Sequence, residues 1–199
     1  MKKILLALIY FIFAFKSSLA ESCLDAQNDY EKFLNASIGR MINIAKIKVS
    51  PEMQEKMMEK LLFECVDIEK VSKRVLGRAK WQELTKEEKD NFLMEYPKYF
   101  ISNFKDIVLV ALNGIESFNT RKLGEGNSHI VSLKYADKSK KDIEIVLEIE
   151  EKEGKLKITD GKFAELSIVT SQRQMFDRLY DQNSKVIKEF KAEKYLTKQ

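Results

Sequence analysis

The side chains of this sequence that could do chemistry do not form a catalytic pattern. The single histidine, His129, falls on the apolar side of an alternating segment, where a structural role is the simpler interpretation. A zinc site needs several Cys, His or carboxylate ligands, and the sequence has no such cluster at suitable spacing. It also has no glycine-rich phosphate loop, dinucleotide fingerprint or G-x-S-x-G elbow. We therefore expect no enzyme activity, no metal and no cofactor.

Carboxylates are abundant, but their spacing indicates a solvated surface. Glu144, Glu148 and Glu150 share the polar face of a segment whose other face is apolar. A solvated strand face explains these residues better than acid–base catalysis does.

The two cysteines, Cys23 and Cys65, are not spaced as a C-x-x-C redox pair. An oxidising compartment would permit a disulfide between them, which would tie the start of the first helix to the end of the second. We favour this disulfide, and two separate thiols are the alternative.

The first 20 residues predict the compartment. A basic Met1-Lys2-Lys3 precedes an apolar run, and Ser18-Leu19-Ala20 has the small-x-small pattern of a signal-peptidase cleavage site. These features are typical of a cleavable secretory signal peptide. A membrane anchor is the alternative, but the apolar run of about 12 residues is short for a bilayer core that needs about 20. We expect an exported protein with a signal peptide over residues 1–20 and a single domain over residues 21–199.

The net charge of the mature chain argues against a nucleic-acid partner. Residues 1–20 contain three lysines and no acid, so their removal lowers the formal net charge from +4 to +1. The basicity of the sequence thus belongs mainly to the targeting signal, and we expect no binding to nucleic acid.

Apolar spacing and capping residues predict helices in the first 112 residues. An amphipathic helix is expected over residues 24–48, and a second begins at Ser50-Pro51, an N-cap followed by an N1 proline. A third short helix is expected between Asp67 and Gly77. A long helix begins with the capping box Thr85-x-x-Glu88 and ends before Asn113-Gly114.

The long helix carries more apolar surface than one partner can cover. Its aromatic and aliphatic side chains recur every four residues, a spacing that drifts about 40° around the helix at each step. The helix must therefore pack against two or more elements, or against one element and a ligand. Pro97 lies inside it and predicts a kink or a break.

After Gly114 the apolar period changes from 3.6 to 2, which predicts strands. Strands are expected over about residues 115–121, 128–136 and 142–150, and one or two more between 155 and 169. Asp160-Gly161 predicts a tight turn that divides this last region, and a closing helix is expected from Ser171 to about Lys194.

This order of elements predicts an α+β fold. In it, N-terminal helices and one C-terminal helix pack on a four- to five-stranded antiparallel sheet. The sequence shows no internal repeat, linker or low-complexity run, which agrees with one domain.

Two patches of the sequence follow the pattern of a known family. The first contains Val75-Leu76-Gly77, then Trp81, Thr85 and Phe92. The second contains the segments 155–160, 165–169 and 173–176, which read KLKITD, ELSIV and RQMF. In these patches the sequence resembles the MlaC family, also called the toluene-tolerance auxiliary family, and the similarity covers roughly residues 25–190.

The sequence departs from the family pattern in the second patch. Leu156 stands where the family usually has an aromatic residue, and Glu165 stands where it has a glycine. The resemblance also implies a strand that continues past Asp160, against the turn expected from Asp160-Gly161.

The resemblance implies a periplasmic phospholipid carrier that shuttles lipid between the outer and inner membranes and maintains outer-membrane lipid asymmetry. The implied partners are phospholipid, an inner-membrane ABC transporter with its lipid-binding receiving protein, and an outer-membrane lipoprotein complex. The acyl chains would occupy an apolar pocket enclosed between helices and sheet. By motif match and inward phase, we expect this pocket to be lined by Val75, Leu76, Trp81, Phe92, Tyr96, Phe100, Phe104, Val108, Tyr135 and Val169.

Three basic residues are candidates for contact with a partner or with the lipid head group. They are Arg74, Arg78 and Lys80. The alternative is that they only complement the negative end of a helix dipole.

Two other classes of function stay open at this point. A periplasmic lipoprotein carrier or chaperone would also need an apolar groove, but it would co-purify with protein. A hydrolase or isomerase on a similar scaffold would need an acid–base pair in the pocket, and titratable residues are scarce on the apolar faces.

Overall fold

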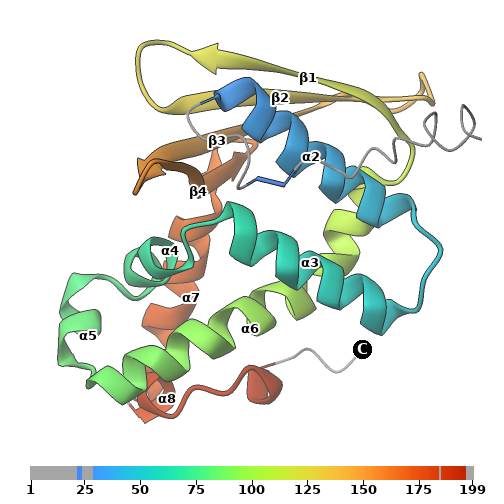
Figure 1. The fold of residues 1–199 in the computed structure, drawn as a ribbon. Helices are drawn as coiled ribbons and strands as arrows, with labels where there is room; N and C mark the ends of the chain where they lie inside the picture. The colour runs from blue at the N-terminus through green and yellow to red at the C-terminus, as the bar shows by residue number, and fades with distance from the viewer. Residues whose placement is uncertain (1–21, 24–28, 184, 196–199) are drawn as a thin grey trace, which may run out of the picture.

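The computed structural model describes residues 22–23, 29–183 and 185–195, without the side chains of Phe104 and Ile107. The predicted signal peptide, residues 1–20, lies outside this part. Helices come first, then an antiparallel sheet of five strands in the order β1-β2-β3-β4-β5, then further helices (Figure 1). The α+β fold predicted from the sequence is confirmed.

The N-terminal helices follow the predicted order. They are α2 (Tyr30–Lys46), α3 (Pro51–Cys65), α4 (Ile68–Leu76), α5 (Arg78–Glu83) and α6 (Lys86–Leu112). The sequence analysis did not anticipate α5, the short helix that carries Trp81. Residues 24–28, the expected start of the first helix, lie outside the described residues.

Local capping explains where these helices begin. The side chains of Asp29, Ser50 and Asp67 each accept a hydrogen bond from a backbone N–H three residues further on. Thr85 and Glu88 make both bonds of the predicted capping box. The caps at Ser50, Asp67 and Thr85 involve only neighbouring residues, which is why the sequence located them correctly. Asp29 was not predicted as a cap, since the first helix was expected to include it.

The break considered at Pro97 does not occur, because α6 is continuous over 27 residues. Contacts with α2, α3 and α4 hold α6 along its length. This packing offsets the one backbone hydrogen bond that proline removes.

The sheet is an antiparallel meander. Its strands are β1 (Ile115–Leu123), β2 (Ser128–Tyr135), β3 (Ile143–Lys152), β4 (Lys155–Phe163) and β5 (Leu166–Ser167). Each strand pairs with the next along the chain.

The tight turn expected at Asp160-Gly161 is wrong. β4 continues through both residues, which pair with Glu148 and Leu147 of β3. Gly161 instead permits a close approach, because an added Cβ would lie 3.2 Å from Cδ1 of Ile168. The actual turn falls at Ala164 and Glu165, which have φ values of 48° and 68°. The continuous strand implied by the family resemblance is the correct one.

The single closing helix expected over residues 171–194 is also wrong. The chain forms α7 (Ile168–Gln182), α8 (Lys185–Lys188) and a 3₁₀ turn, η1 (Ala192–Tyr195). Asn183 ends α7 in an extended conformation, and its side chain accepts a hydrogen bond from the Lys185 N–H. This change of direction lets Phe190 return to α6, where its ring lies 5.3 Å from that of Phe92.

Two clusters of buried side chains stabilise the fold. The first, which we call the sheet core, joins α2, α3 and the end of α6 to the sheet, with Phe33, Val131 and Ile149 fully buried. The second, the helical core, joins α4, α6, α7 and α8 around Phe92 and Phe176. Among the helices and strands of the described residues, only α6 contributes to both cores, since it runs from one to the other.

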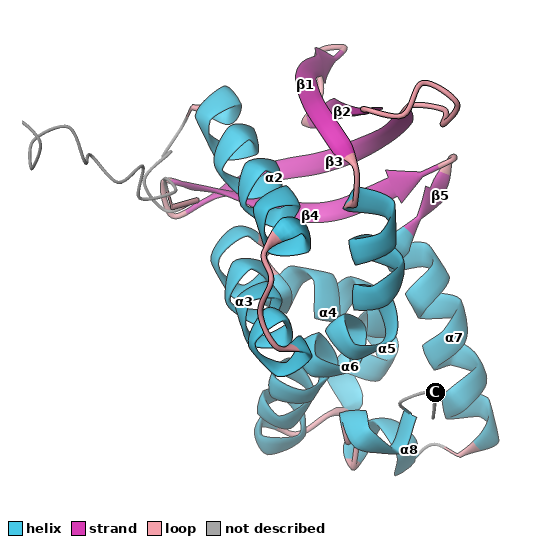
Figure 2. Ribbon diagram, turned by 90° about the vertical axis from the view of Figure 1, so that its right-hand side faces the viewer, coloured by secondary structure: helices cyan, strands magenta, loops and turns pink. Residues whose placement is uncertain are grey.

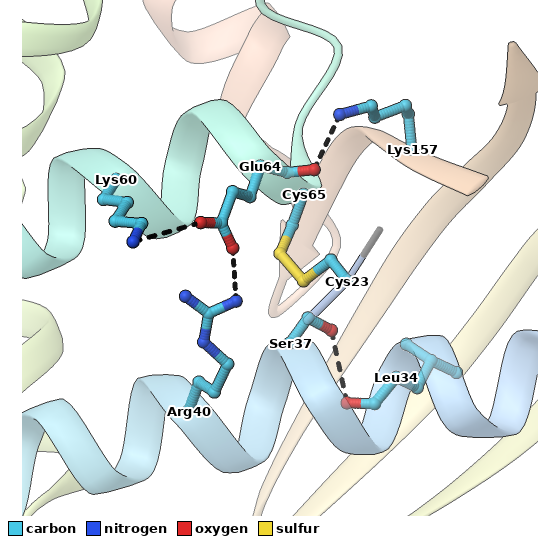
Figure 3. Close-up of a disulfide and its surroundings, with 8 residues drawn as sticks. All are labelled: Cys23, Leu34, Ser37, Arg40, Lys60, Glu64, Cys65 and Lys157. Atoms are coloured by element: carbon cyan, nitrogen blue, oxygen red, sulfur yellow. Dashed lines mark hydrogen bonds and ion pairs between the residues drawn. A yellow bond between two sulfur atoms is a disulfide. The ribbon is translucent and has the colours of Figure 1, made fainter. Parts of the chain in front are cut away.

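A disulfide joins Cys23 to Cys65, the last residue of α3 (Figure 3). Both cysteines are buried in the sheet core. Beside them, Glu64 forms an ion pair with Arg40 of α2, and the Glu64 carbonyl accepts a hydrogen bond from Lys157 of β4 at 2.6 Å. These bonds fasten the N-terminal segment, two helices and the sheet together.

The double variant Cys23→Ser/Cys65→Ser should lower the free energy of unfolding by about 2–4 kcal/mol, because the disulfide restricts the unfolded chain across 42 residues of sequence. Urea denaturation measures this difference, and reduced wild-type protein should lose a similar amount. Equal stability of the variant and the oxidised wild type would contradict the structural role of the bond.

Candidate functional site

Four apolar side chains form a row across the sheet toward the β5 edge. Val131 pairs with Ile145, Ile145 with Phe163, and Phe163 with Leu166. Side chains of directly paired residues lie on the same face of a sheet, so these four project to one side. We call them the apolar row.

The apolar row lies on the face that packs against helices. Leu147 and Ile149 alternate in phase with Ile145 along β3, and both belong to the sheet core with residues of α2 and α3. Figure 2 shows β5 and the end of β4 on the side of the sheet away from α2. The helices thus cover the row unevenly.

Burial decreases steadily along the row. Val131 is fully buried and Ile145 is half-buried, whereas Phe163 is 54% exposed and Leu166 is 70% exposed. Ile168, the next apolar residue, is also exposed. This apolar face begins in the core and ends in solvent, which makes the β5 edge a candidate interaction site.

A buried carboxylate positions this open edge. Oδ1 of Asp160 accepts hydrogen bonds from the N–H groups of Gly161 at 2.8 Å and Val169 at 3.2 Å. Oδ2 accepts one from Ser167 Oγ at 2.6 Å and is 3.4 Å from Nη2 of Arg74. Asp160 therefore connects β4, β5, the start of α7 and α4 through a single side chain.

The sequence analysis missed Phe163, Leu166 and Ile168 as site residues. The expected turn at Asp160-Gly161 obscured them, since it placed all three residues within one strand after that turn. The better signal was the pair Phe163 and Leu166, two apolar residues on either side of the two-residue turn, at the position where the family usually has a glycine.

The predicted pocket residues divide between the two cores. Val75, Leu76, Phe92, Tyr96 and Val169 are buried in the helical core. Trp81 and Phe100 pack against that core, whereas Val108 and Tyr135 belong to the sheet core. The side chain of Phe104 lies outside the described residues. The structure therefore does not bring the set together as one lining, and its role in binding stays a prediction.

Burial shifts the pKa of two tyrosines of the helical core and of the single histidine. Burial raises the pKa of Tyr96, and it also raises the pKa of Tyr99, whose hydroxyl lies 2.7 Å from Sδ of Met175. Burial lowers the pKa of His129, whose ring stacks on Tyr30 with centroids 4.8 Å apart. These environments favour uncharged side chains at neutral pH.

The three basic candidates do not act as one group. Arg74 and Arg78 line a surface hollow of about 450 Å³ together with Trp81. Lys80 instead forms an ion pair with Asp177, and its ammonium lies 5.0 Å from the ring of Tyr180. The remaining lining residues of the hollow are Lys70, Lys73, Gln82 and Arg173. We call this site the cationic hollow.

The sequence analysis did not include Lys70, Lys73 or Arg173 among the candidate residues. Lys70, Lys73 and Arg74 lie three and four residues apart on α4, a spacing that places them on one helix face. That signal was readable, whereas the approach of Arg173 from α7 depends on tertiary structure.

In the described part of the chain, no group of three or more His, Cys, Asp or Glu side chains could hold a metal ion. No helix there is both long enough and apolar enough to cross a membrane.

Comparison with solved structures identifies a relative of this fold. A phospholipid-binding protein from Ralstonia solanacearum, solved in complex with a phospholipid, superposes with a TM-score of 0.60 at 10% sequence identity. The match covers 77% of this chain and 88% of that chain. At this identity the similarity shows a common fold. No curated protein gives a match.

The fold and its open edge define an α+β protein whose sheet presents a partly uncovered apolar face. The sequence model of the family described as "MlaC protein" matches residues 31–192, most of the chain. The protein belongs to the MlaC family.

Asp160→Asn should lower the free energy of unfolding by about 1–3 kcal/mol, because the amide cannot accept all the bonds made to the buried carboxylate. Asp142→Asn, at an exposed residue before β3, is the matched control and should be nearly neutral. Urea denaturation measures both, and amide exchange at Gly161 and Val169 should accelerate only in Asp160→Asn. Equal effects of the two changes would refute the connecting role of Asp160.

Proposed function

We propose that this protein is a periplasmic phospholipid carrier whose acyl chains bind along the apolar row. The observation that carries the proposal is the row itself, which leads from fully buried Val131 to largely exposed Leu166. Membership in the MlaC family and the common fold with a phospholipid-binding protein support the same class of ligand.

The physical chemistry of the ligand explains why a carrier needs such a surface. Burial of a CH₂ group contributes about 0.8 kcal/mol, so exposing a chain of about 15 carbons costs on the order of 10 kcal/mol. A carrier must cover this surface in water and still release it at a membrane. A row that is continuous with the core but open at its end offers both apolar contact and a route out.

We place the acyl chains between the two cores. The predicted pocket residues come from both cores, and α6 connects these cores. A ligand that enters at Phe163 and Leu166 would pass between them, so Phe100 and Val108 of α6 would face it from the helical side. In this arrangement the polar head group stays at the β5 edge.

We propose binding and transport, without catalysis, as the activity of this protein. We further propose that the carrier shuttles phospholipid between the outer and inner membranes and maintains lipid asymmetry. It would exchange lipid with an inner-membrane ABC transporter and with an outer-membrane lipoprotein complex, as the family resemblance implies.

Lipid analysis tests this proposal directly. Residues 21–199, expressed in a periplasm and purified, should release stoichiometric phospholipid into an organic extract measured by mass spectrometry. A folded protein that carries no lipid would refute the proposal. Co-purification with a lipoprotein in place of free phospholipid would instead indicate the lipoprotein-carrier alternative.

Leu166→Asp should reduce bound phospholipid about tenfold, since a Leu side chain buried against a ligand contributes roughly 1.5–3 kcal/mol. The change should leave the stability of the protein nearly unaltered, because Leu166 is 70% exposed. Leu123→Asp is the matched control, since Leu123 is exposed at the β1 edge, opposite β5. Lipid extracted per mole of protein measures both variants, and an equal loss in both would count against the β5 edge as the binding site.

A further inference from the structure

The cationic hollow has a lining of unusual charge. Of its seven lining residues, five are Lys or Arg and none is acidic. They come from α4, α5 and α7, so three separate helices present positive charge to one hollow of about 450 Å³. None of them belongs to the apolar row.

Three of the five cations have carboxylate partners. Lys70 pairs with Glu150, Lys73 pairs with Glu69, and Arg74 contacts both Glu148 and Asp160. Their charges are therefore largely neutralised within the protein.

The other two cations, Arg78 and Arg173, are not neutralised. Arg173 donates hydrogen bonds to the backbone carbonyl of Arg74, a neutral group, from Nε at 2.7 Å and also from Nη2. Arg78 is exposed and has no hydrogen-bond or ion-pair partner among the described residues. The hollow thus has an excess of two positive charges.

The hollow is also held in place before any ligand arrives. Arg74 donates to the Thr159 carbonyl at 3.0 Å and contacts Asp160, whose side chain is 1% exposed. Since Arg173 is bound to the backbone of Arg74, the bonds of Arg74 to Thr159 and Asp160 position both Arg74 and Arg173. A pre-positioned guanidinium loses little conformational entropy when it binds an anion.

Trp81 gives the hollow an aromatic wall. The ammonium groups of Lys73 and Lys89 lie 5.7 Å and 6.0 Å from its ring centroid. The hollow is large enough for more than a bare ion, because a water molecule occupies about 30 Å³ of liquid. An anion with a small organic group would fit between the indole and the arginines.

We propose that the cationic hollow is a binding site for a phosphate ester. Guanidinium groups match the geometry of phosphate oxygens, and two uncompensated arginines would balance the two charges of a phosphomonoester and exceed the single charge of a phosphodiester. This site goes beyond the proposed carrier function, since it is separate from the apolar row and would bind a charged phosphate group, whereas the row would bind acyl chains. The ester can come from a lipid head group or from a soluble phosphate.

Trp81 is the only tryptophan in the chain, so its fluorescence reports on the hollow. The full mature protein is titrated with glycerol phosphate, with phosphatidylglycerol vesicles and with phosphatidylcholine vesicles. We expect a saturable fluorescence change with glycerol phosphate if the source is soluble, and only with phosphatidylglycerol vesicles if it is a lipid head group. A saturable response to neither phosphatidylglycerol nor glycerol phosphate would overturn the proposal.

Arg78→Gln should weaken this binding about tenfold, because it removes a charge-assisted hydrogen bond from an exposed residue with no structural partner. Arg121→Gln is the matched control, since Arg121 is an exposed arginine on β1 and its replacement changes the net charge equally. The control should bind as the wild type does. An equal loss of affinity in both variants would show that the effect depends only on net charge, and it would overturn the proposed site.

The extracted phospholipid of the same preparations separates this inference from the carrier function. If the phosphate source is soluble, Arg78→Gln should retain wild-type amounts of lipid while its phosphate affinity falls about tenfold; if the source is a lipid head group, its extracted phospholipid should fall as well. If the wild type carries lipid but does not respond to either phosphate source, the hollow is refuted and the carrier function stands. If it responds but carries no lipid, the carrier function fails and the hollow stands.

Discussion

The carboxylate of Asp160 is the interaction on which the functional surfaces depend. It is buried within β4, yet it accepts bonds from Gly161, Ser167 and Val169 and contacts Arg74. It therefore holds the last strand pair, the first turn of α7 and α4 in one arrangement. Its negative charge also faces the N-terminus of α7, where the helix dipole favours it. Burial of one charge is tolerated because an arginine and three donors surround it.

Two different surfaces follow from this single anchor. On one side, the β4–β5 turn is fixed so that Phe163 and Leu166 continue the apolar face of the sheet into solvent. On the other side, Arg74 is held toward the cationic hollow, and Arg173 is bound to its backbone. An apolar edge suits acyl chains, and a basic hollow suits a phosphate.

Local signals in the sequence predicted much of the fold, and tertiary contacts account for the rest. Ser50, Asp67 and Thr85 cap helices through neighbouring residues, so their positions could be read directly. The turn predicted at Asp160-Gly161 was wrong because bonds from residues distant in the sequence override the local turn preference of this dipeptide. The residues chosen for the pocket all lie on the inward-facing sides of the predicted elements. This position predicts that a side chain is buried, but it does not say in which of the two cores. The open edge could not be predicted, since exposure of Phe163 depends on where the helices end.

Photoaffinity labelling tests the central claim most directly. A phospholipid with a diazirine near the middle of an acyl chain is loaded into the protein, irradiated and located by peptide mass spectrometry. The account predicts labels on the β3, β4 and β5 segments that contain Ile145, Phe163 and Leu166, with α6 labelled opposite them. Labels confined to β1 or to the surface of α3, or loading with no labels at the β5 edge, would contradict it.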